Sequence, residues 1–572
     1  MPDGRCYRFD RFELDTVGRV LLRDGKRVLV APKAIDVLIA LIEARDHAVG
    51  KEDLLRKVWG DAIVEEGSLT SHVSLLRKAL GEDGHGGFIE TIPKRGYRFV
   101  GEVLDASQPA AAQDRIMLVV LPFKSLGADQ EHDYFSEGLT EEMIAQVARL
   151  SPERLGVIAR TSAMRYAATT KSIRQIGREL SVSHVLEGSV RRVGDRARIT
   201  AQLVRVKDET QLWAESYERN LHDILALQVD VARAIAREIE IQLAPHVQRR
   251  LDHTRAVSAP AHEAYLKGRH LWYQRTEEAM RKSIDYFELA ITEQRDYAAA
   301  YNGIADAYTM LACRGVMPAS ETFDKAKRAA RQALQIDPDL GEAYAALAHV
   351  RLHDWDWIGL DQDFQRALAL SPGYAIAHYW YAEYLMAMGR QNESIARVKQ
   401  ARQLDPVNSV LNGSVGMIHY LARQYDRAAQ ELAQALEIDP GHFLLHLRLG
   451  LVYEQQQRFD DAIHEMEKAV NLSGRSSEAL AGLAQACAAA GQRARSQEIV
   501  DTLLAESKTR YVSPYNLGRV YASLKDGEQT LSWLERAYAE HHPDLIELRT
   551  EPRFDGVRSE PRFTRLLSRV GF

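Results

Sequence analysis

The chain has 572 residues, which is too long for a single hydrophobic core, so we expect several domains. Its formal net charge of -6 excludes a generally polybasic protein, and any nucleic-acid contact must come from a local basic patch. The three widely spaced cysteines (Cys6, Cys313 and Cys487) exclude a disulfide framework and show no zinc-ligand spacing, and no apolar run approaches the roughly 20 residues that span a bilayer. We therefore predict a cytoplasmic protein that contacts no membrane.

The first region, residues 1–103, alternates short strands with helical segments. The runs YRFDRFEL, RVLL and RVLV are each typical of a strand, while PKAIDVLIALIEA and KEDLLRKVW have helical periodicity. A third helical segment, GSLTSHVSLLRKAL, runs from Gly67 to Leu80 without an acidic residue. In this segment Val73, Leu76 and Leu80 recur at i, i+3 and i+7, so we predict that they face the core and that the polar positions face outward.

A basic hairpin-like run, TIPKRGYRFV, follows this helix and places Lys94, Arg95 and Arg98 within five positions. We expect Gly96 to let the backbone turn close to a duplex, and Ile92, Phe99 and Val100 to anchor the hairpin to the core. Small polar side chains suit a helix that enters a major groove, and cations and hydroxyls suit phosphates. The predicted DNA-contacting residues are Ser68, Thr70, Ser71, His72, Ser74, Leu75, Arg77, Lys78, Thr91, Lys94, Arg95, Tyr97 and Arg98.

Taken alone, each cluster is also consistent with a solvated basic surface, but a helix followed by a basic hairpin favours a winged helix. Residues 5–101 resemble the OmpR/PhoB-type winged-helix domain through VLVAPKAIDVLIALIE, KEDLLRKVWG, VEEGSLTSHVSLLRKALGED and FIETIPKRGYRFVGEV. The resemblance implies that the third helix enters the major groove, that the wing reaches the minor groove or its phosphates, and that the loop at about residues 60–67 touches RNA polymerase.

The resemblance also implies which side chains contact bases or phosphates: His72, Ser74, Leu75, Arg77, Thr91, Lys94, Arg95 and Tyr97. Ser74 and Leu75 stand where the family often has arginine, so we expect fewer direct guanine contacts. No receiver domain precedes the winged helix, and we therefore expect control from the C-terminal side. This order resembles that of the CadC/ToxR/HilA group, although no transmembrane segment follows.

The next segment, residues 104–115 (LDASQPAAAQDR), has no apolar period and is predicted to be a linker. In residues 116–245 the strand-like IMLVVLPF and LGVIART alternate with the helical TEEMIAQVARL and SIRQIGREL. Three strand-like runs follow, the first two joined by a predicted turn at Gly194-Asp195, before a helix from about Ile224. This region looks like the amino-terminal domain of TolB, which implies a small α/β fold that binds or transmits rather than catalyses.

From residue 262 to 572 the pattern is helical with a 34-residue period, marked by Pro338, Pro372, Pro406 and Pro440. Small residues recur in the same phase, so pairs of antiparallel helices can pack closely. They are Ala348, Ala382, Gly416, Gly450, Ala484 and Gly518, and then Ala333, Ala367, Ala401, Ala435, Ala469 and Ala537, with Leu503 as the exception. This pattern resembles the tetratricopeptide repeat, with about seven or eight units and a terminal cap.

Few residues outside the first region suggest chemistry. Glu137, Glu141, Glu142, Arg160, Glu187 and Arg191 can be drawn into a catalytic site, but such positions are usually helix caps or solvated faces. His442 and His446 have the i, i+4 spacing of a metal site without a third ligand nearby, and Trp355 and Trp357 suggest aromatic packing. We therefore predict no catalytic residue, no cofactor and no metal, and hence a protein that is not an enzyme.

The predicted fold class is multidomain α+β: an N-terminal winged helix-turn-helix, a central small α/β domain, and a C-terminal all-α tetratricopeptide-repeat solenoid. We interpret the chain as a sequence-specific transcriptional regulator that binds double-stranded DNA, with two half-sites suggesting a homodimer. RNA polymerase is an expected partner from the resemblance, and the repeats would receive a protein or peptide signal. The alternatives are an interaction scaffold whose winged helix does not bind DNA, and a nucleotide-binding enzyme that works through the central domain.

Overall fold

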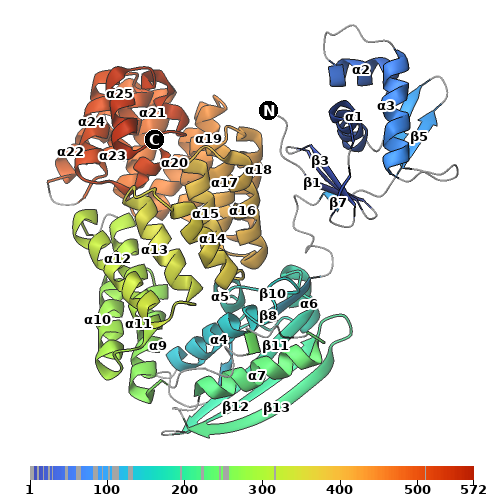
Figure 1. The fold of residues 1–572 in the computed structure, drawn as a ribbon. Helices are drawn as coiled ribbons and strands as arrows, with labels where there is room; N and C mark the ends of the chain where they lie inside the picture. The colour runs from blue at the N-terminus through green and yellow to red at the C-terminus, as the bar shows by residue number, and fades with distance from the viewer. Residues whose placement is uncertain are drawn as a thin grey trace. The chain divides into compact units, whose positions relative to one another are not determined.

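The structure, a computed structural model, forms two compact units, residues 1–114 and 115–572, and each is described by itself (Figure 1). The described residues are 6–9, 12–16, 19–23, 26–28, 30–44, 49–59, 66–80, 88–92, 95–100, 104–105, 115–126, 133–193, 196–220, 224–241, 243, 247–248, 257–314, 317–508 and 511–572.

The first unit places three helices between a five-stranded sheet and a hairpin. The sheet has the order β4-β3-β2-β1-β7, all antiparallel, from β1 (Cys6–Phe9), β2 (Phe12–Asp15), β3 (Val20–Arg23), β4 (Lys26–Val28) and β7 (Leu104–Asp105). The helices are α1 (Pro32–Glu43), α2 (Lys51–Trp59) and α3 (Glu66–Ala79), and the hairpin is β5 (Ile89–Ile92) with β6 (Gly96–Phe99).

Two sequence predictions for this unit are wrong. The run YRFDRFEL is not one strand: β1 and β2 pair antiparallel with Phe9 opposite Phe12, because both phenylalanines pack into the same core. The predicted linker also begins too early, since Leu104 and Asp105 form β7 and pair with β1. The sheet of the first unit therefore includes two residues whose sequence shows no strand pattern.

The core of the first unit confirms the predicted inner face of α3. Val73, Leu76 and Leu80 are buried there, and Leu69 joins them one turn earlier. The rings of Phe9, Phe12, Phe88 and Phe99 pack against one another next to them, with centroids 5.2 to 6.0 Å apart. This cluster joins the sheet, α3 and the hairpin into one core.

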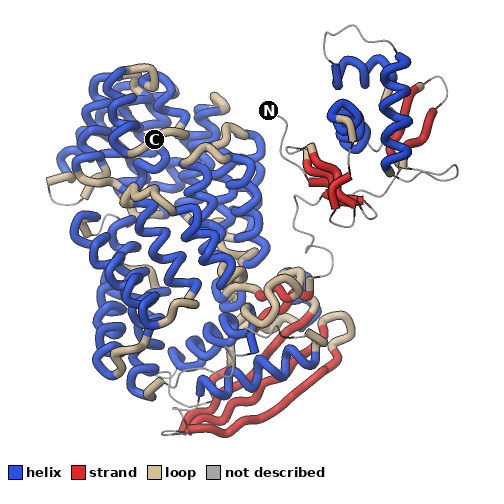
Figure 2. The backbone as a smooth tube through the Cα atoms, in the orientation of Figure 1, coloured by secondary structure: helices blue, strands red, loops and turns tan. Residues whose placement is uncertain are grey.

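The second unit begins with a mixed sheet, whose strands are red in Figure 2. The strand order is β10-β8-β11-β12-β13, with β9 paired to β11. Its strands are β8 (Ile116–Val120), β9 (Lys124–Ser125), β10 (Leu155–Val157), β11 (His184–Val193), β12 (Arg196–Arg205) and β13 (Thr210–Asn220). Its helices are α4 (Asp133–Ala148), α5 (Arg160–Met164), α6 (Ile173–Glu179) and α7 (Ile224–Glu238). The predicted strand LGVIART ends earlier than expected, because Arg160 and Thr161 begin α5, and the predicted turn at Gly194-Asp195 lies outside the described residues.

The rest of the second unit is a repeat array of eight helix pairs, α9 to α24, among the described residues. The pairs are α9 (Ala259–Tyr273) with α10 (Glu277–Glu293), α11 (Ala298–Cys313) with α12 (Ala319–Ile336), α13 (Gly341–His353) with α14 (Leu360–Leu370), α15 (Ala375–Ala387) with α16 (Gln391–Leu404), α17 (Ser409–Leu421) with α18 (Tyr425–Ile438), α19 (Phe443–Gln455) with α20 (Phe459–Leu472), α21 (Ser477–Ala489) with α22 (Arg493–Glu506), and α23 (Pro514–Ser523) with α24 (Gly527–Ala539). Two 3-10 helices, η3 (Pro543–Glu547) and η4 (Pro552–Val557), and α25 (Pro561–Val570) follow.

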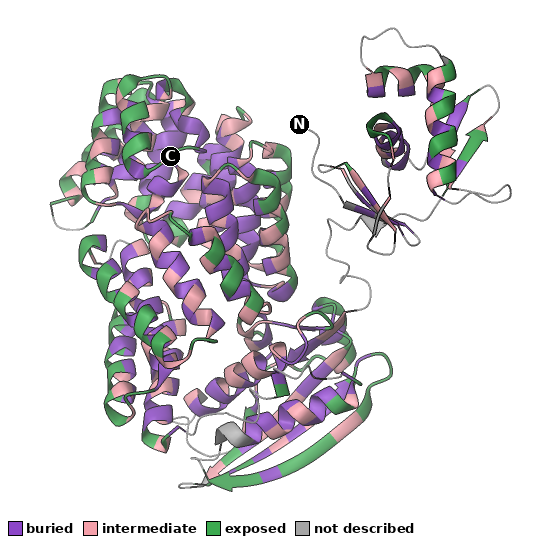
Figure 3. Ribbon diagram, in the orientation of Figure 1, coloured by how far each residue is buried: buried purple, intermediate pink, exposed green. Residues whose placement is uncertain are grey.

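The 34-residue pattern is confirmed in detail. Each marker proline lies two residues after the second helix of a pair, and the predicted small residues are buried between helices, as Figure 3 shows for the array as a whole. His378, Asn412 and His446, which are also 34 apart, each lie within hydrogen-bond distance of the carbonyl oxygen of the preceding marker proline, at 2.8 to 2.9 Å. His446 therefore has a structural role, which confirms the packing interpretation over a metal pair with His442.

The described residues contain no helix that is both long enough and apolar enough to pass through a bilayer.

Candidate nucleic-acid interface and repeat surface

One face of α3 presents a continuous exposed stripe. Gly67, Thr70, Ser71, Ser74, Leu75 and Lys78 are all exposed, and their spacing of three and four residues places them on one side of the helix. Leu75 is 50% exposed and adds one apolar side chain to this face. The stripe combines small hydroxyls, one apolar side chain and one cation, which is a combination that can contact base edges and phosphates.

Three further predicted contacts lie at the border of this stripe and are only half-exposed: Ser68, His72 and Arg77. The His72 ring packs edge-on against Trp59, and its Nδ1 lies 2.7 Å from the carbonyl oxygen of Ser68. The Arg77 Nη2 donates to the Ile89 carbonyl at 2.7 Å and to Thr91 Oγ1 at 2.9 Å. Arg77 therefore joins α3 to β5, a bracing role that its sequence position alone did not indicate.

Val49 lies beside the hairpin as a third segment, because its backbone forms an antiparallel bridge with Tyr97. Tyr97 is only 5% exposed and packs in the core, so the prediction that its side chain contacts phosphate is corrected. Gly96 has a φ of +137°, and a Cβ there would lie 1.9 Å from the Val49 carbonyl oxygen. The glycine is thus required by packing within the domain, which corrects the predicted reason of approach to a duplex.

The cations of the wing differ in their surroundings. Arg95 is exposed, whereas Arg98 donates to Glu90 Oε2 across the hairpin at 2.6 Å, so its charge is already paired. Lys94 and residues 60–65 of the predicted polymerase-contacting loop lie outside the described residues. Val100, expected to anchor the wing, is 47% exposed, and Phe99 fills the core instead, because alternate residues of a strand face opposite sides.

In the repeat array, the first helices of successive pairs contact one another from α11 to α23 and form a continuous row. The chain's own residues 543–557, called here the C-terminal segment, lie on this row. In it η3 contacts α11, α13 and α15, while η4 contacts α23 and α24. Trp355 and Trp357, between α13 and α14, pack against the end of the chain: Trp355 stacks on His541 at 3.9 Å, and Trp357 donates to the Val570 carbonyl at 2.7 Å.

A buried ion pair anchors this segment. Arg553 donates from Nε and Nη2 to the two carboxylate oxygens of Glu551, at 2.8 and 2.6 Å, and both side chains are at most 2% exposed. Burial acts to raise the pKa of Glu551, but the adjacent Arg553 lowers that pKa to about 2. Tyr420 and Gln485, on two helices of the row, bind the same pair. The surface that tetratricopeptide repeats offer to partners is thus partly covered by the chain itself.

The central domain is docked on the array at two places. At the first, Asp405 accepts hydrogen bonds from the Ser162 backbone and hydroxyl at 2.8 and 2.6 Å, and both residues are fully buried. The backbone amide of Ala159 also donates to the Leu404 carbonyl at 2.7 Å. Arg149 binds Glu342 at 2.5 Å on another repeat. Sequence reasoning missed these residues, because polar residues at helix ends are common and nothing in their spacing joins positions 193 or 243 apart.

At the second place, α4 of the central domain packs against α9, the first helix of the array. Three carboxylates of α4 that sequence alone allowed to be catalytic are used in this contact. Glu137 binds Arg160 and His270, Glu141 binds Arg269 and Tyr273, and Glu142 binds His262, at 2.5 to 3.1 Å. These carboxylates therefore join α4 to α9, which differs from the helix caps or solvated faces expected from the sequence.

Comparison with known families identifies three regions. Residues 25–99 match the family described as "Transcriptional regulatory protein, C terminal", and residues 113–234 match "HilA/YgeH-like transcriptional regulator, second domain". Residues 419–471 and 453–513 match "Tetratricopeptide repeat". The second match covers the region that looks like TolB in sequence, and the TolB resemblance itself stays a prediction.

Individual proteins are similar to parts of this chain. "Transcriptional regulator HilA" of Salmonella typhimurium is 28% identical over 410 residues, which are 71% of this chain and 72% of that protein. "Putative adenylate cyclase 3" of Rhizobium meliloti is 29% identical over 299 residues, 50% of this chain and 43% of that protein. The solved DNA-binding domain of Escherichia coli CadC is 25% identical with a TM-score of 0.17, and covers 18% of this chain and 96% of that chain.

The matched regions agree with what the geometry offers: a helix with an exposed polar stripe beside a wing, a docked second domain and a repeat array. The chain is therefore a transcriptional regulator with an OmpR/PhoB-type DNA-binding domain, a HilA-like second domain and tetratricopeptide repeats for protein interaction.

Proposed function

We propose that the exposed stripe of α3 reads the major groove of the operator. The single observation that carries this proposal is the stripe itself, in which small hydroxyls, Leu75 and Lys78 share the exposed side of the helix that is followed by a basic hairpin. Ser71 and Ser74 can bond to base edges or phosphates, Lys78 supplies a phosphate contact, and Leu75 suits the methyl group of thymine. Leu75 and Ser74 together favour A·T-containing steps over runs of guanine.

In this proposal the wing adds affinity more than sequence preference. Arg95 is exposed on the hairpin turn and is placed to bind a phosphate or the minor groove. Arg77 supports this contact by fixing the angle between α3 and β5 through Ile89 and Thr91. Thr70, Ser68, His72, Thr91, Lys94 and Arg98 remain proposed secondary contacts.

We propose further that the array receives a protein or peptide signal and passes it through the central domain. Support comes from the contacts that hold the central domain to both the α16–α17 turn and α9. Through these contacts, a movement of the repeat helices would shift α4 and α5. Displacement of the C-terminal segment from the row of first helices would be one such change. Contact with RNA polymerase through residues 60–67, and homodimerisation on paired half-sites, belong to the same proposal.

The test is genome-wide DNA occupancy of the full-length protein beside a Leu75→Ala/Lys78→Ala/Arg95→Ala variant. We expect discrete promoter peaks that vanish in the variant. A matched control is Arg191→Ala/Lys207→Ala, which removes two exposed cations from the central domain and should leave the peaks in place. Peaks that persist in the first variant would refute the proposed interface.

The rival function is nucleotide chemistry in the central domain, which the similarity to a protein named a putative adenylate cyclase favours. We propose that this chain lacks that activity, because the clustered carboxylates of α4 are occupied by Arg160, Arg269 and His262. Incubation of the full chain with ATP and Mg²⁺ or Mn²⁺, followed by chromatography, should yield no cyclic nucleotide. Turnover that is abolished by Glu141→Gln would establish the rival function.

A further inference from the structure

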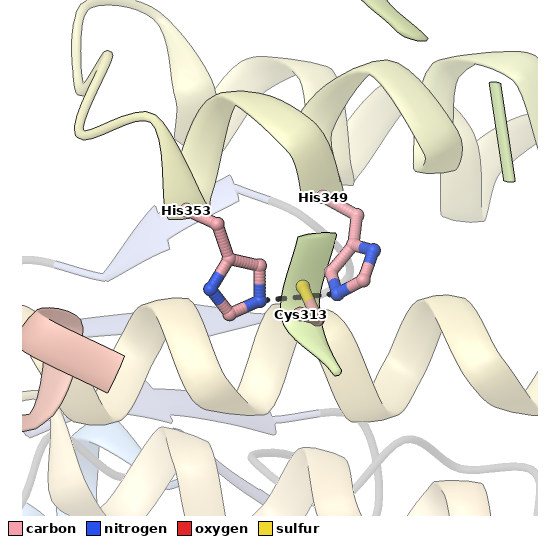
Figure 4. A group of neighbouring side chains, drawn as sticks. All are labelled: Cys313, His349 and His353. Atoms are coloured by element: carbon pink, nitrogen blue, oxygen red, sulfur yellow. Dashed lines mark hydrogen bonds between the residues drawn. The ribbon is translucent and has the colours of Figure 1, made fainter. Parts of the chain in front are cut away.

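A thiol and two buried imidazoles meet where α11 and α13 approach the C-terminal segment. Cys313 is the last residue of α11, and His349 and His353 lie one turn apart on α13 (Figure 4). Their ligand atoms all lie within 4.8 Å of one another. Both imidazoles are buried, at 6% and 7% exposure, while Cys313 is partly exposed. The three side chains form a compact set of nitrogen and sulfur donors that neither DNA binding nor domain docking uses.

The spacing of the two imidazoles is that of ligands around one ion. Their Nε2 atoms are 3.2 Å apart. In a tetrahedral site with Zn–N bonds of about 2.0 to 2.1 Å, two nitrogen ligands are separated by about 3.3 Å. A Zn–S bond of about 2.3 Å would place the sulfur about 3.5 Å from each nitrogen. Because the ligand atoms lie within 4.8 Å of one another, Sγ has to approach by about 1.3 Å at most. Cys313 ends its helix, where such a shift requires little rearrangement.

Both rings are also oriented as metal ligands are. The Nδ1 of His353 lies 3.3 Å from the carbonyl oxygen of Pro543, so a proton on Nδ1 leaves the Nε2 lone pair facing the cluster. The His349 ring is stacked on Trp380 with centroids 3.9 Å apart and planes 7° from parallel. A hydrogen bond at the other ring nitrogen, as on His353, fixes the tautomer and direction of a ligating imidazole, and the stack on Trp380 fixes the ring plane of His349.

The protonation states are compatible with this use. Burial lowers the pKa of both imidazoles, and the nearby His353 lowers the pKa of His349 further, which favours the neutral rings. Burial raises the pKa of the Cys313 thiol, so an ion has to displace the thiol proton. Neutral imidazole and deprotonated sulfur are the forms that bind metals.

We propose that Cys313, His349 and His353 bind one zinc(II) ion, with water as the fourth ligand. Thiolate and imidazole donors suit zinc and disfavour Mg²⁺ and Ca²⁺, which prefer oxygen. Three protein ligands with one open position also describe known zinc sites. Because His353 bonds to Pro543 as well, the ion would join α11, α13 and η3, and would favour the arrangement in which the C-terminal segment lies on the row of first helices.

The experiment titrates ZnCl2 into metal-free full-length protein against a chromophoric chelator. The variants are Cys313→Ser, His349→Gln and His353→Gln, and the matched controls are Cys487→Ser and His378→Gln, a buried thiol and a buried imidazole outside the cluster. We expect one zinc ion per chain in the wild type and controls. Each ligand variant should bind at least about tenfold more weakly, since even the loss of an outer partner costs roughly 10- to 100-fold.

Cobalt(II) tests the ligand identity separately. The wild-type protein with CoCl2 should show a sulfur-to-cobalt charge-transfer band in the near ultraviolet, and this band should be absent in Cys313→Ser. Equal zinc affinity in all variants, a cobalt spectrum without a sulfur band, or binding of Cu⁺ without binding of Zn²⁺ would each overturn the proposal.

A measurement on the wild type alone covers the case in which a variant fails to fold. Alkylation of Cys313 by iodoacetamide, mapped by mass spectrometry, should be slowed at least about tenfold by one equivalent of ZnCl2 and restored by a chelator, because a zinc-bound thiolate is shielded from the reagent. An unchanged alkylation rate with zinc present would contradict the site.

Discussion

The winged-helix unit and the repeat-containing unit use charged side chains in opposite ways. On α3, Lys78 is exposed next to Leu75, whereas Arg553 and Glu551 of the second unit are buried against each other. Similarly, Arg149 and Arg269 form ion pairs between the central domain and the array. The comparison teaches that α3 leaves a stripe of polar groups exposed, while the second unit buries several of its charged pairs between its own parts.

The largest expected effect breaks the buried pair. Arg553→Met should lower the free energy of unfolding by about 3 to 5 kcal/mol, because it leaves the carboxylate of Glu551 buried without its partner. Urea unfolding followed by tryptophan fluorescence measures this. Arg495→Met, which removes an exposed pair with Glu467, should cost less than about 1 kcal/mol. Equal costs for the two variants would show that the C-terminal segment is not anchored as described.

The next effect tests whether packing, rather than DNA, requires a glycine in the wing. Gly96→Ala should destabilise the first unit by at least about 2 kcal/mol, since the added Cβ meets the Val49 carbonyl and the backbone has a positive φ. Gly67→Ala, whose Cβ would meet nothing within 4 Å, should be neutral or slightly stabilising on its helix. Thermal unfolding followed by circular dichroism compares the two. A stable Gly96→Ala protein with impaired DNA binding would restore the interpretation from sequence.

The exposed stripe should separate sequence reading from phosphate binding. Leu75→Ala should cost about 1 to 3 kcal/mol on the operator and almost nothing on unrelated duplex, because a lost apolar base contact affects one sequence only. Lys78→Ala should weaken both and reduce the slope of log K against log salt by about one. Fluorescence anisotropy over a salt series measures both variants. Identical behaviour of the two would show that Leu75 does not read a base.

The smallest effect is a pH dependence confined to the C-terminal segment. Burial, and next the charges of Asp544 and Glu551, raise the pKa of Glu547 from an ordinary 4.5 to about 8. The folded state therefore holds a proton that the unfolded state releases, so stability is fully present below pH 4.5 and is lost as the pH rises through 8.

In the wild type the free energy of unfolding should fall by about 1 to 2 kcal/mol more between pH 5 and pH 9 than in Glu547→Gln. The difference is modest because solvent partly screens this half-exposed side chain. Urea midpoints at several pH values provide the measurement. A pH profile identical to that of the wild type would place the titrating group elsewhere.

Much of this architecture could be predicted from periodic patterns. The inner face of α3 follows from Val73, Leu76 and Leu80, and the array from the prolines 34 residues apart, because helix packing repeats at short, regular spacing. Tyr97 and Arg77 could not be placed in the same way. Their residue types suit a phosphate, but the structure directs one into the core and the other to the carbonyl of Ile89.

The sequence by itself determined most local elements, their order and the families of the first and last parts, since these depend on residues a few positions apart. Only the tertiary structure decided which polar residues meet across long separations: Ser162 with Asp405, Tyr420 with Glu551, and Cys313 with His349 and His353. The physical reason is that an apolar period records which face of a helix is buried, whereas a polar contact depends on the path of the whole superhelix, which no single period encodes.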